Sequence, residues 1–201
     1  MHRQTRAIVC FARWHGETGA VVRLLTPDLG LIAAYVAGGR GRHLRPLLIP
    51  GNCLSAELRA RTEGQMPHAR VELLLSRAPW LAEPLPAAAI GWATALSAAA
   101  LPDHQAYPPL YAALDALLDA ICHAPSARGW LPGLIAFEGL VLRELGYGGG
   151  AAVATPADWP VLLAAFDALG RDLARYPLAD RRGDVMAARA VLRQRLGRIE
   201  A

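Results

Sequence analysis

The hydrophobic pattern of this chain changes its period near Pro79, and that change constrains the fold more than any other feature. Before Pro79, apolar and polar residues tend to alternate, most strictly over residues 53–61. A period of two is typical of a strand with one buried side. After Pro79, apolar residues recur at helical spacing between prolines and glycines. We therefore expect an α+β fold, with strands first and helices second.

Five short strands are expected before Pro79. Apolar segments rich in β-branched residues occur at 5–12, 19–26 and 31–37, and a last candidate strand covers 70–75. An open sheet of so few strands would leave two edges exposed, and closure into a barrel removes them. The pattern therefore predicts a small closed barrel.

The second part of the chain is predicted to be helical, with segments at 86–101, 107–123, 130–146, 158–174 and 184–199. The third segment is apolar on nearly all sides, so we expect it to be the central helix of a bundle. The longest uncharged run, Pro84–Pro102, is rich in alanine and is interrupted by proline, glycine and hydroxyl residues. This composition favours a buried helix over a membrane span. We predict one domain over residues 1–78 and a helical domain over residues 79–201.

Charge divides the chain as well. All 21 basic side chains are arginines; residues 1–77 carry 11 of them against 5 acidic residues, 78–180 carry 4 against 10, and 181–201 carry 6 against 2. The basic segments favour a polyanionic partner. The absence of lysine excludes a phosphate-binding loop of the Walker type and Schiff-base chemistry.

Motifs for catalysis and for metal binding are weak or incomplete. There is no HExxH or GxSxG, and His15-Gly16-Glu17 lacks the PCxxC that completes a zinc-deaminase site. Cys10, Cys53 and Cys122 form no CxxC pair, which fits reduced thiols in the cytoplasm. We therefore expect no enzyme and no cofactor. A pocket with paired titrating groups would revive the alternative of a hydrolase.

The glycine-rich segment 38–45 is the strongest local feature of the sequence. Its alternating arginines can follow a phosphate backbone, while its glycines allow close approach. An isolated arginine triplet is more often an ordinary solvated loop, but further arginines on neighbouring strands reverse that preference. The predicted nucleic-acid contacts are Arg13, Arg23, Arg40, Arg42, Arg45, Arg59 and Arg61.

Aromatic residues such as Trp14 and Tyr35 beside these arginines are typical of a surface for single-stranded nucleic acid. Tyr35 fits the barrel core equally well. The last helix carries Arg189 and Arg193 four residues apart. That helix provides either a second phosphate-binding surface or a side that packs against the acidic middle of the chain.

Several segments together resemble the bacterial RecO family of recombination mediators, over nearly the whole chain. They are Trp14-His15-Gly16-Glu17-Thr18, Leu24-Leu25-Thr26 with the turn at Gly30, Tyr35-Val36-Ala37-Gly38-Gly39-Arg40, and the run from Phe137-Glu138 to Gly146-Tyr147-Gly148. The Glu-Leu-Gly-Tyr-Gly end of the last run is the most specific part.

The resemblance implies an N-terminal oligonucleotide-binding (OB) barrel, a C-terminal helical domain and a non-enzymatic role in DNA repair and recombination. It implies binding of single- and double-stranded DNA, annealing of complementary strands, and action with RecR. It also implies help in loading RecA onto strands coated by single-stranded-DNA-binding protein, whose acidic C-terminal tail is engaged. Such a protein is expected in the cytoplasm, associated with the nucleoid.

Two departures from the family pattern qualify these expectations. Many members carry a four-cysteine zinc module where residues 149–155 here contain no cysteine, so zinc is not expected. Some members place basic residues before the Phe-Glu pair, where this chain has Ile135 and Ala136. Arg128 or Arg143 would then have to contact the acidic tail. The alternative function is a generic OB-type RNA-binding module without mediator activity.

Overall fold

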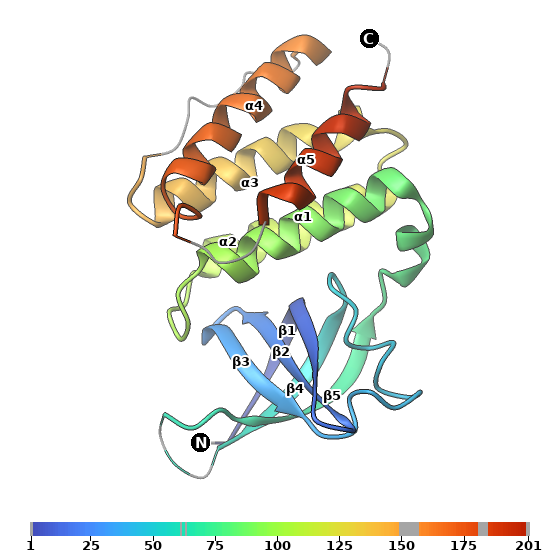
Figure 1. The fold of residues 1–201 in the computed structure, drawn as a ribbon, viewed down its shortest axis with the longest axis vertical. Coiled ribbons are helices and arrows are strands. Elements are labelled where there is room, and N and C mark those ends of the chain that lie inside the picture. The colour runs from blue at the N-terminus through green and yellow to red at the C-terminus, as the bar shows by residue number, and fades with distance from the viewer. Residues whose placement is uncertain (1, 61, 63, 149–156, 181–184, 200–201) are drawn as a thin grey trace.

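The alternating segments form a closed barrel, and the helices that follow form a bundle over it, with α1 and α2 nearest the barrel (Figure 1). The computed structural model describes residues 2–60, 62, 64–148, 157–180 and 185–199. The strands are β1 (His2–His15), β2 (Gly19–Thr26), β3 (Gly30–Val36), β4 (Cys53–Arg59) and β5 (His68–Leu75). They pair in the order β1-β2-β3-β5-β4, and the sheet closes on itself.

All neighbouring strands of the barrel are antiparallel except β3 and β5, which run parallel and meet through Tyr35 and His68. The first part of β1 pairs with β4 and its second part pairs with β2, with a bulge between Val9 and Phe11. Side chains that point inward form an apolar core of their own, which includes Leu24, Ile32 and Leu54. The α+β fold with an OB-type barrel is thereby confirmed.

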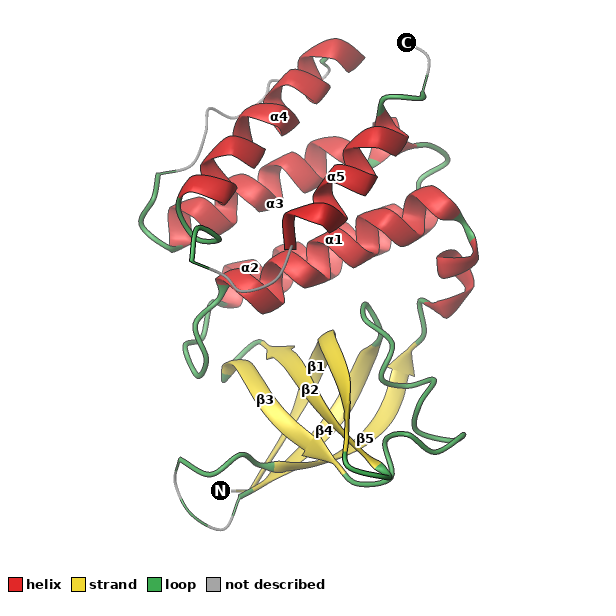
Figure 2. Ribbon diagram, in the orientation of Figure 1, coloured by secondary structure: helices red, strands yellow, loops and turns green. Residues whose placement is uncertain are grey.

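The helices follow the barrel in the chain and cover one side of it (Figure 2). They are two 3₁₀ turns, η1 (Ala78–Ala82) and η2 (Ala127–Gly129), and the helices α1 (Pro84–Ala100), α2 (Pro108–His123), α3 (Leu131–Glu144), α4 (Trp159–Arg175) and α5 (Val185–Leu196). Helix α3 packs against both α2 and α4, as expected from its apolar surface. In the described part of the chain, no helix combines the length and hydropathy needed to cross a bilayer.

The helical core continues onto the outside of the barrel. Ile8, Cys10, Leu25 and Leu31 point outward from their strands and are buried against the helices in the same cluster as Trp92. These strands therefore carry apolar side chains on both faces of the sheet. The inward side chains fill the barrel, and the outward side chains pack against the helices.

Polar contacts at the junction between barrel and helices centre on Arg77, which is 1% exposed. Its guanidinium donates to Gly51 O (2.7 Å) and to the carboxylates of Asp115 (3.1 Å) and Asp119 (2.6 Å) on α2. A buried guanidinium requires such partners because desolvating a charge without them is costly. The strands and helices are thus joined by oriented polar bonds as well as by apolar contact.

Candidate nucleic-acid interface

The predicted arginine triplet lies in the segment between β3 and β4, which we call the arginine loop (residues 37–52). The side chains of Arg40, Arg42 and Arg45 are all exposed. The same loop buries Leu48 and partly buries Leu44 and Leu47 against the inner core of the barrel. The leucines hold the loop over one open end of the barrel, while the arginines face solvent.

The arginine loop is also fixed to the hairpin between β1 and β2. The backbone N–H of Arg40 donates to Thr18 O (3.0 Å), and its guanidinium donates to Gly16 O (3.3 Å). The guanidinium of Arg45 lies 5.6 Å from the ring centre of Trp14, which is itself 43% exposed. This arrangement places an exposed indole next to a guanidinium group, as in many surfaces that stack bases and bind phosphates.

A row of directly paired residues runs around the outside of the barrel from strand to strand, and we call it the outer row. Its members are, in order, Arg13, Val21, Tyr35, His68, Arg59 and His2. Four of the six are exposed, and Tyr35 is half-buried. Neighbouring strands are about 4.8 Å apart, so the row brings arginine, histidine and tyrosine side chains close together on the outside of the barrel, interrupted by the buried Val21.

Tyr35 belongs to the outer surface and not to the inner core, which settles the alternatives left by the sequence. Its ring makes edge contacts with His15 (6.2 Å between ring centres) and His68 (5.2 Å). The ring lies directly over Gly19, where a Cβ would come within 2.3 Å of the tyrosine oxygen. Glycine at that position leaves room for the ring to lie flat on the barrel.

Arg59 is exposed, but part of its charge is offset by a neighbour. Its guanidinium donates to Glu57 Oε1 (2.6 and 3.1 Å), and His2 Nε2 lies 2.6 Å from the same oxygen. The hydrogen bond from Arg59, followed by that from His2, lowers the pKa of Glu57. Arg59 therefore contributes less net positive potential than the arginines of the loop.

The structure places Arg23 apart from the other predicted contacts. Its guanidinium donates to Ala98 O at the end of α1 (2.5 Å) and to the carboxylate of Asp103. It thus lies at the junction of barrel and helices. The remaining predicted residue, Arg61, falls outside the described residues.

Arg128 and Arg143 lie at opposite ends of α3. The helix has 14 residues, which corresponds to about 21 Å at 1.5 Å per residue. Arg128 is exposed and stacks 5.3 Å from the ring of Trp159, and Arg143 is exposed in the last turn. The two guanidinium groups cannot hold the same carboxylate, so a bound acidic tail would use one of them or span the helix.

The arginines of α5 pack against the acidic middle of the chain. Arg189 forms a two-point ion pair with the fully buried Glu138 (2.8 and 3.0 Å), and Arg193 pairs with Asp167 (2.7 and 3.0 Å). Of the two roles considered for this helix, packing against the acidic middle is the one that the structure shows for these side chains.

The thiols are chemically quiet. Cys10, Cys53 and Cys122 are buried and unpaired. Burial raises the pKa of Cys10 to about 12 and also raises the pKa of the other two. Within the described ranges, no cluster of three or more histidine, cysteine or acidic side chains could hold a metal ion. Residues 149–155, where the sequence lacks the zinc-module cysteines, lie outside those ranges.

Sequence reasoning did not single out His2, His15 or His68 as part of the surface, because His2 and His15 lie at opposite ends of β1 and His68 begins β5. Only the strand registers around the whole barrel bring His2 and His68 into the outer row with Arg13, and His15 joins the surface through its contact with Tyr35. The ion pairs of Arg23 and Arg77 were also not predicted, since their partners lie 38 to 80 residues away along the chain.

Comparison with known proteins identifies two matching family regions. Residues 1–76 match the family model "Recombination protein O N terminal", and residues 84–148 match "Recombination protein O C terminal". Proteins named DNA repair protein RecO are 39% identical in Phenylobacterium zucineum and 38% identical in Caulobacter vibrioides strain NA1000 / CB15N, each over 149 residues. Another from Rhodospirillum centenum is 40% identical over 143 residues.

These alignments cover 71–74% of this chain and 56–60% of the relatives, so the chain spans somewhat more than half of their length. The two family regions follow one another in the same order as the barrel and the helices. The chain belongs to the RecO family of DNA repair proteins.

Proposed function

We propose that this protein is a non-enzymatic recombination mediator that binds single- and double-stranded DNA and anneals complementary strands. It acts with RecR and helps to load RecA onto strands coated by single-stranded-DNA-binding protein. The observation that carries the proposal is the arginine loop, with three exposed arginines, one of which, Arg45, stacks on the exposed ring of Trp14. Family membership adds the context of DNA repair.

The proposed DNA-binding domain is the barrel, residues 1–78, and the helical domain is residues 79–201. Arg40, Arg42 and Arg45 bind phosphates, and Arg13 and Arg59 extend the contact along the outer row. Exposed cationic side chains of this kind give an affinity that falls with salt, because bound phosphates release counterions. Arg23 and Arg61 were also predicted from the sequence; Arg23 donates to Ala98 O and to Asp103, so we do not expect it to contribute to the salt dependence of DNA binding.

The first test measures the salt dependence of binding to a 20-nucleotide single strand. The triple variant Arg40→Ala/Arg42→Ala/Arg45→Ala is compared with Arg171→Ala/Arg175→Ala/Arg198→Ala, which removes three exposed arginines from the helical side. We expect the loop variant to reduce the slope of log K against log salt by about 2, at about 0.7 per phosphate. An unchanged slope in the loop variant would refute the loop assignment.

The second test measures annealing of complementary strands that are coated with the cognate single-stranded-DNA-binding protein, either intact or without its acidic tail. We expect faster annealing with the intact protein. Charge reversal at Arg128 or at Arg143, tested one at a time, should remove the advantage of the tail if that residue binds it. If annealing is equally fast with the intact and the tailless single-stranded-DNA-binding protein, the proposed annealing activity stands and the proposed binding of the tail is refuted.

A generic RNA-binding role is the second candidate, because a cationic barrel surface with aromatic rings also suits RNA. A strong preference for RNA, together with no acceleration of annealing, would favour that role over the mediator.

A further inference from the structure

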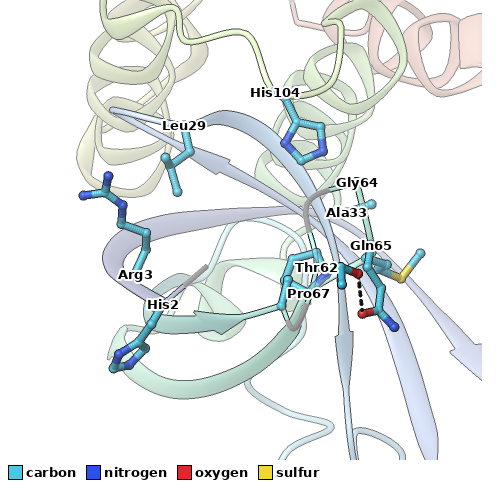
Figure 3. A pocket seen from close by; sticks show the side chains of 11 residues that line it. His2, Arg3, Leu29, Ala33, Thr62, Gly64, Gln65, Pro67 and His104 are labelled. Atoms are coloured by element: carbon cyan, nitrogen blue, oxygen red, sulfur yellow. Dashed lines mark hydrogen bonds between the residues drawn. The ribbon is translucent and has the colours of Figure 1, made fainter.

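The barrel has a second open end, opposite the one that the arginine loop covers. It is where β1 and β5 begin and β4 ends, and it contains a cavity of about 960 Å³ (Figure 3). The lining comes from four separate segments: His2 and Arg3, then Leu29 and Ala33, then Ala60, Thr62 and Gly64–Pro67, and finally His104. This volume is at the upper end of the usual range for small-molecule sites.

Part of the cavity lining is apolar. The apolar residues that line it are Leu29, Ala33, Ala60, Met66 and Pro67; in Figure 3, Leu29 lies apart from Ala33 and Pro67. Met66 is 44% exposed, so its thioether is available for contact. A thioether packs favourably against the edge or face of a flat aromatic ring.

Polar groups are concentrated on the β4–β5 side of the cavity. Thr62 Oγ1 donates to Gln65 Oε1 (3.4 Å), as the dashed line in Figure 3 shows. The bond uses the amide oxygen of Gln65 and leaves its nitrogen, with two N–H donors, on the other side of the amide. A side-chain amide and a hydroxyl are groups that hydrogen-bond the edge of a nucleobase.

The rim of the cavity carries an arginine on one side and, on the other, a histidine whose backbone is held by a hydrogen bond. Arg3 is exposed at the start of β1, and His104 reaches over the cavity from the connection between α1 and α2 (Figure 3). His104 has φ +61°, which is uncommon for a residue other than glycine, and its N–H donates to Leu31 O (3.0 Å). A strained residue held by a backbone bond is a feature that recurs at binding sites.

The outer row connects the two ends of the barrel. Arg13 lies next to Trp14 beside the arginine loop, and His2 lies at the cavity. Five steps between neighbouring strands at about 4.8 Å cover about 24 Å, a distance that a few nucleotides of single strand can span. A strand bound by the arginine loop can therefore cross Tyr35 and His68 and reach the cavity.

We propose that this cavity holds one unstacked base of a single DNA strand whose backbone is bound by the arginine loop. The inference rests on the proposed function, and it adds a specific consequence. A base inside a duplex stays stacked and paired, so it cannot enter the cavity. The cavity therefore favours single-stranded over double-stranded DNA, whereas the arginine loop binds the backbone of both.

The first experiment fills the cavity with a side chain. Ala33→Trp is compared with Ala174→Trp, which places the same ring on an exposed position of α4. Affinities are measured for a 20-nucleotide thymidine strand, for an abasic strand of the same length and for a 20-base-pair duplex. We expect Ala33→Trp to weaken binding of the thymidine strand about tenfold, the effect of losing one stacked base. Binding of the other two substrates stays as in wild type.

The second experiment uses the folded wild-type protein, so it does not depend on tolerance of the tryptophan. The chain has three methionines, and selective ¹³C labelling of their methyl groups gives separate signals for Met66 and for Met186 on α5. Titration with pentathymidylate should shift the Met66 signal through the ring current of the bound base and leave Met186 unchanged. The abasic pentamer should leave both signals in place.

The possible outcomes separate this inference from the proposed function. A Met66 signal that does not move at saturating pentathymidylate, or an Ala33→Trp variant that binds the thymidine strand normally, overturns the cavity proposal alone. An Ala33→Trp variant that binds all three substrates equally weakly also overturns it, because the loss is then not specific to a base. If wild-type protein binds none of the substrates, the proposed function and the cavity proposal fall together.

Discussion

Glu138 and Arg189 illustrate how single residues in this protein are determined by burial. The carboxylate of Glu138 is inaccessible to solvent and accepts bonds from Arg189 and from the indole N–H of Trp92 (2.7 Å). The guanidinium lies 3.6 Å from the ring centre of Phe166. Every charge in this network has a partner, as is required where water cannot solvate it.

Removing one member of the pair should be more damaging than removing both charges. We expect Arg189→Ala to lower the free energy of unfolding by about 3–5 kcal/mol, because the carboxylate of Glu138 stays buried without a cation. The double variant Glu138→Gln/Arg189→Met keeps the volume and the bond from Trp92, so its loss should be smaller. Urea unfolding followed by circular dichroism measures both. A double variant less stable than the single variant would contradict this account.

Cys10 provides a pH-dependent prediction. Its folded pKa is about 12, raised from 9.0 mainly by burial. The thiol therefore contributes fully to stability below about pH 9, and this contribution is lost as the pH rises toward 12, since the unfolded chain releases the proton first. We expect Cys10→Ala to show a smaller drop in the free energy of unfolding between pH 9 and 11 than wild type. Equal pH profiles for both proteins would show that the thiol is not buried as described.

At the scale of elements, the arginine loop depends on close backbone contact with the barrel. A Cβ on Gly39 would come within 2.7 Å of Ala20 Cβ and 3.2 Å of Ala20 N, on β2. The position of the loop, and with it the distance between Arg45 and Trp14, therefore depends on a glycine at this point. The positive charge of the arginine loop does not by itself determine the position of the loop on the barrel.

Gly39→Val should weaken DNA binding although every arginine remains. We expect the side chain to push the loop off β2, to reduce affinity for a single strand several-fold, and to change Trp14 fluorescence. Gly133→Ala on α3 is the matched control, since its Cβ would meet Leu117 at an ordinary 3.7 Å. Alanine there should favour the helix by up to about 1 kcal/mol. Unchanged DNA affinity in Gly39→Val would mean that loop position is unimportant.

Most elements could be predicted from the sequence because their patterns are local. The predicted helix over residues 86–101 lies within two residues of α1, and the strand predicted over residues 19–26 is β2. The strand predicted over residues 5–12 was too short, since β1 runs from His2 to His15. Its ends are exposed and polar, so they show no alternation. Pairing with β4 and β2 makes them strand.

At the scale of the whole molecule, the barrel and the helices are joined by arginines that the sequence did not distinguish from DNA contacts. Arg77 binds α2, and Arg23 binds the end of α1. Arg6 adds a bond to Asp115 (3.4 Å). A basic segment therefore contains two kinds of arginine, one that faces solvent and one that holds the two halves together.

Arg23→Ala should separate these two roles. We expect the free energy of unfolding to fall by about 1–2 kcal/mol, because the charged bond to the Ala98 carbonyl is lost and the partly exposed pair with Asp103 adds little. The salt slope of single-strand binding should not change. Arg13→Ala, on the exposed outer row, should do the reverse and lower the slope by about 0.7. A reduced slope in Arg23→Ala would make it a DNA contact, as the sequence indicated.

By itself, the sequence determined the α+β class, the approximate limits of most elements, the family resemblance and the presence of a basic barrel. These are properties of neighbouring residues, so periodicity, turn residues and charge counts reveal them. Only the tertiary structure decided which arginines face solvent, that Tyr35 lies outside the core, and that the open end of the barrel forms a cavity. Those depend on strand register and helix packing, which bring together residues such as Arg23 and Ala98, 75 positions apart.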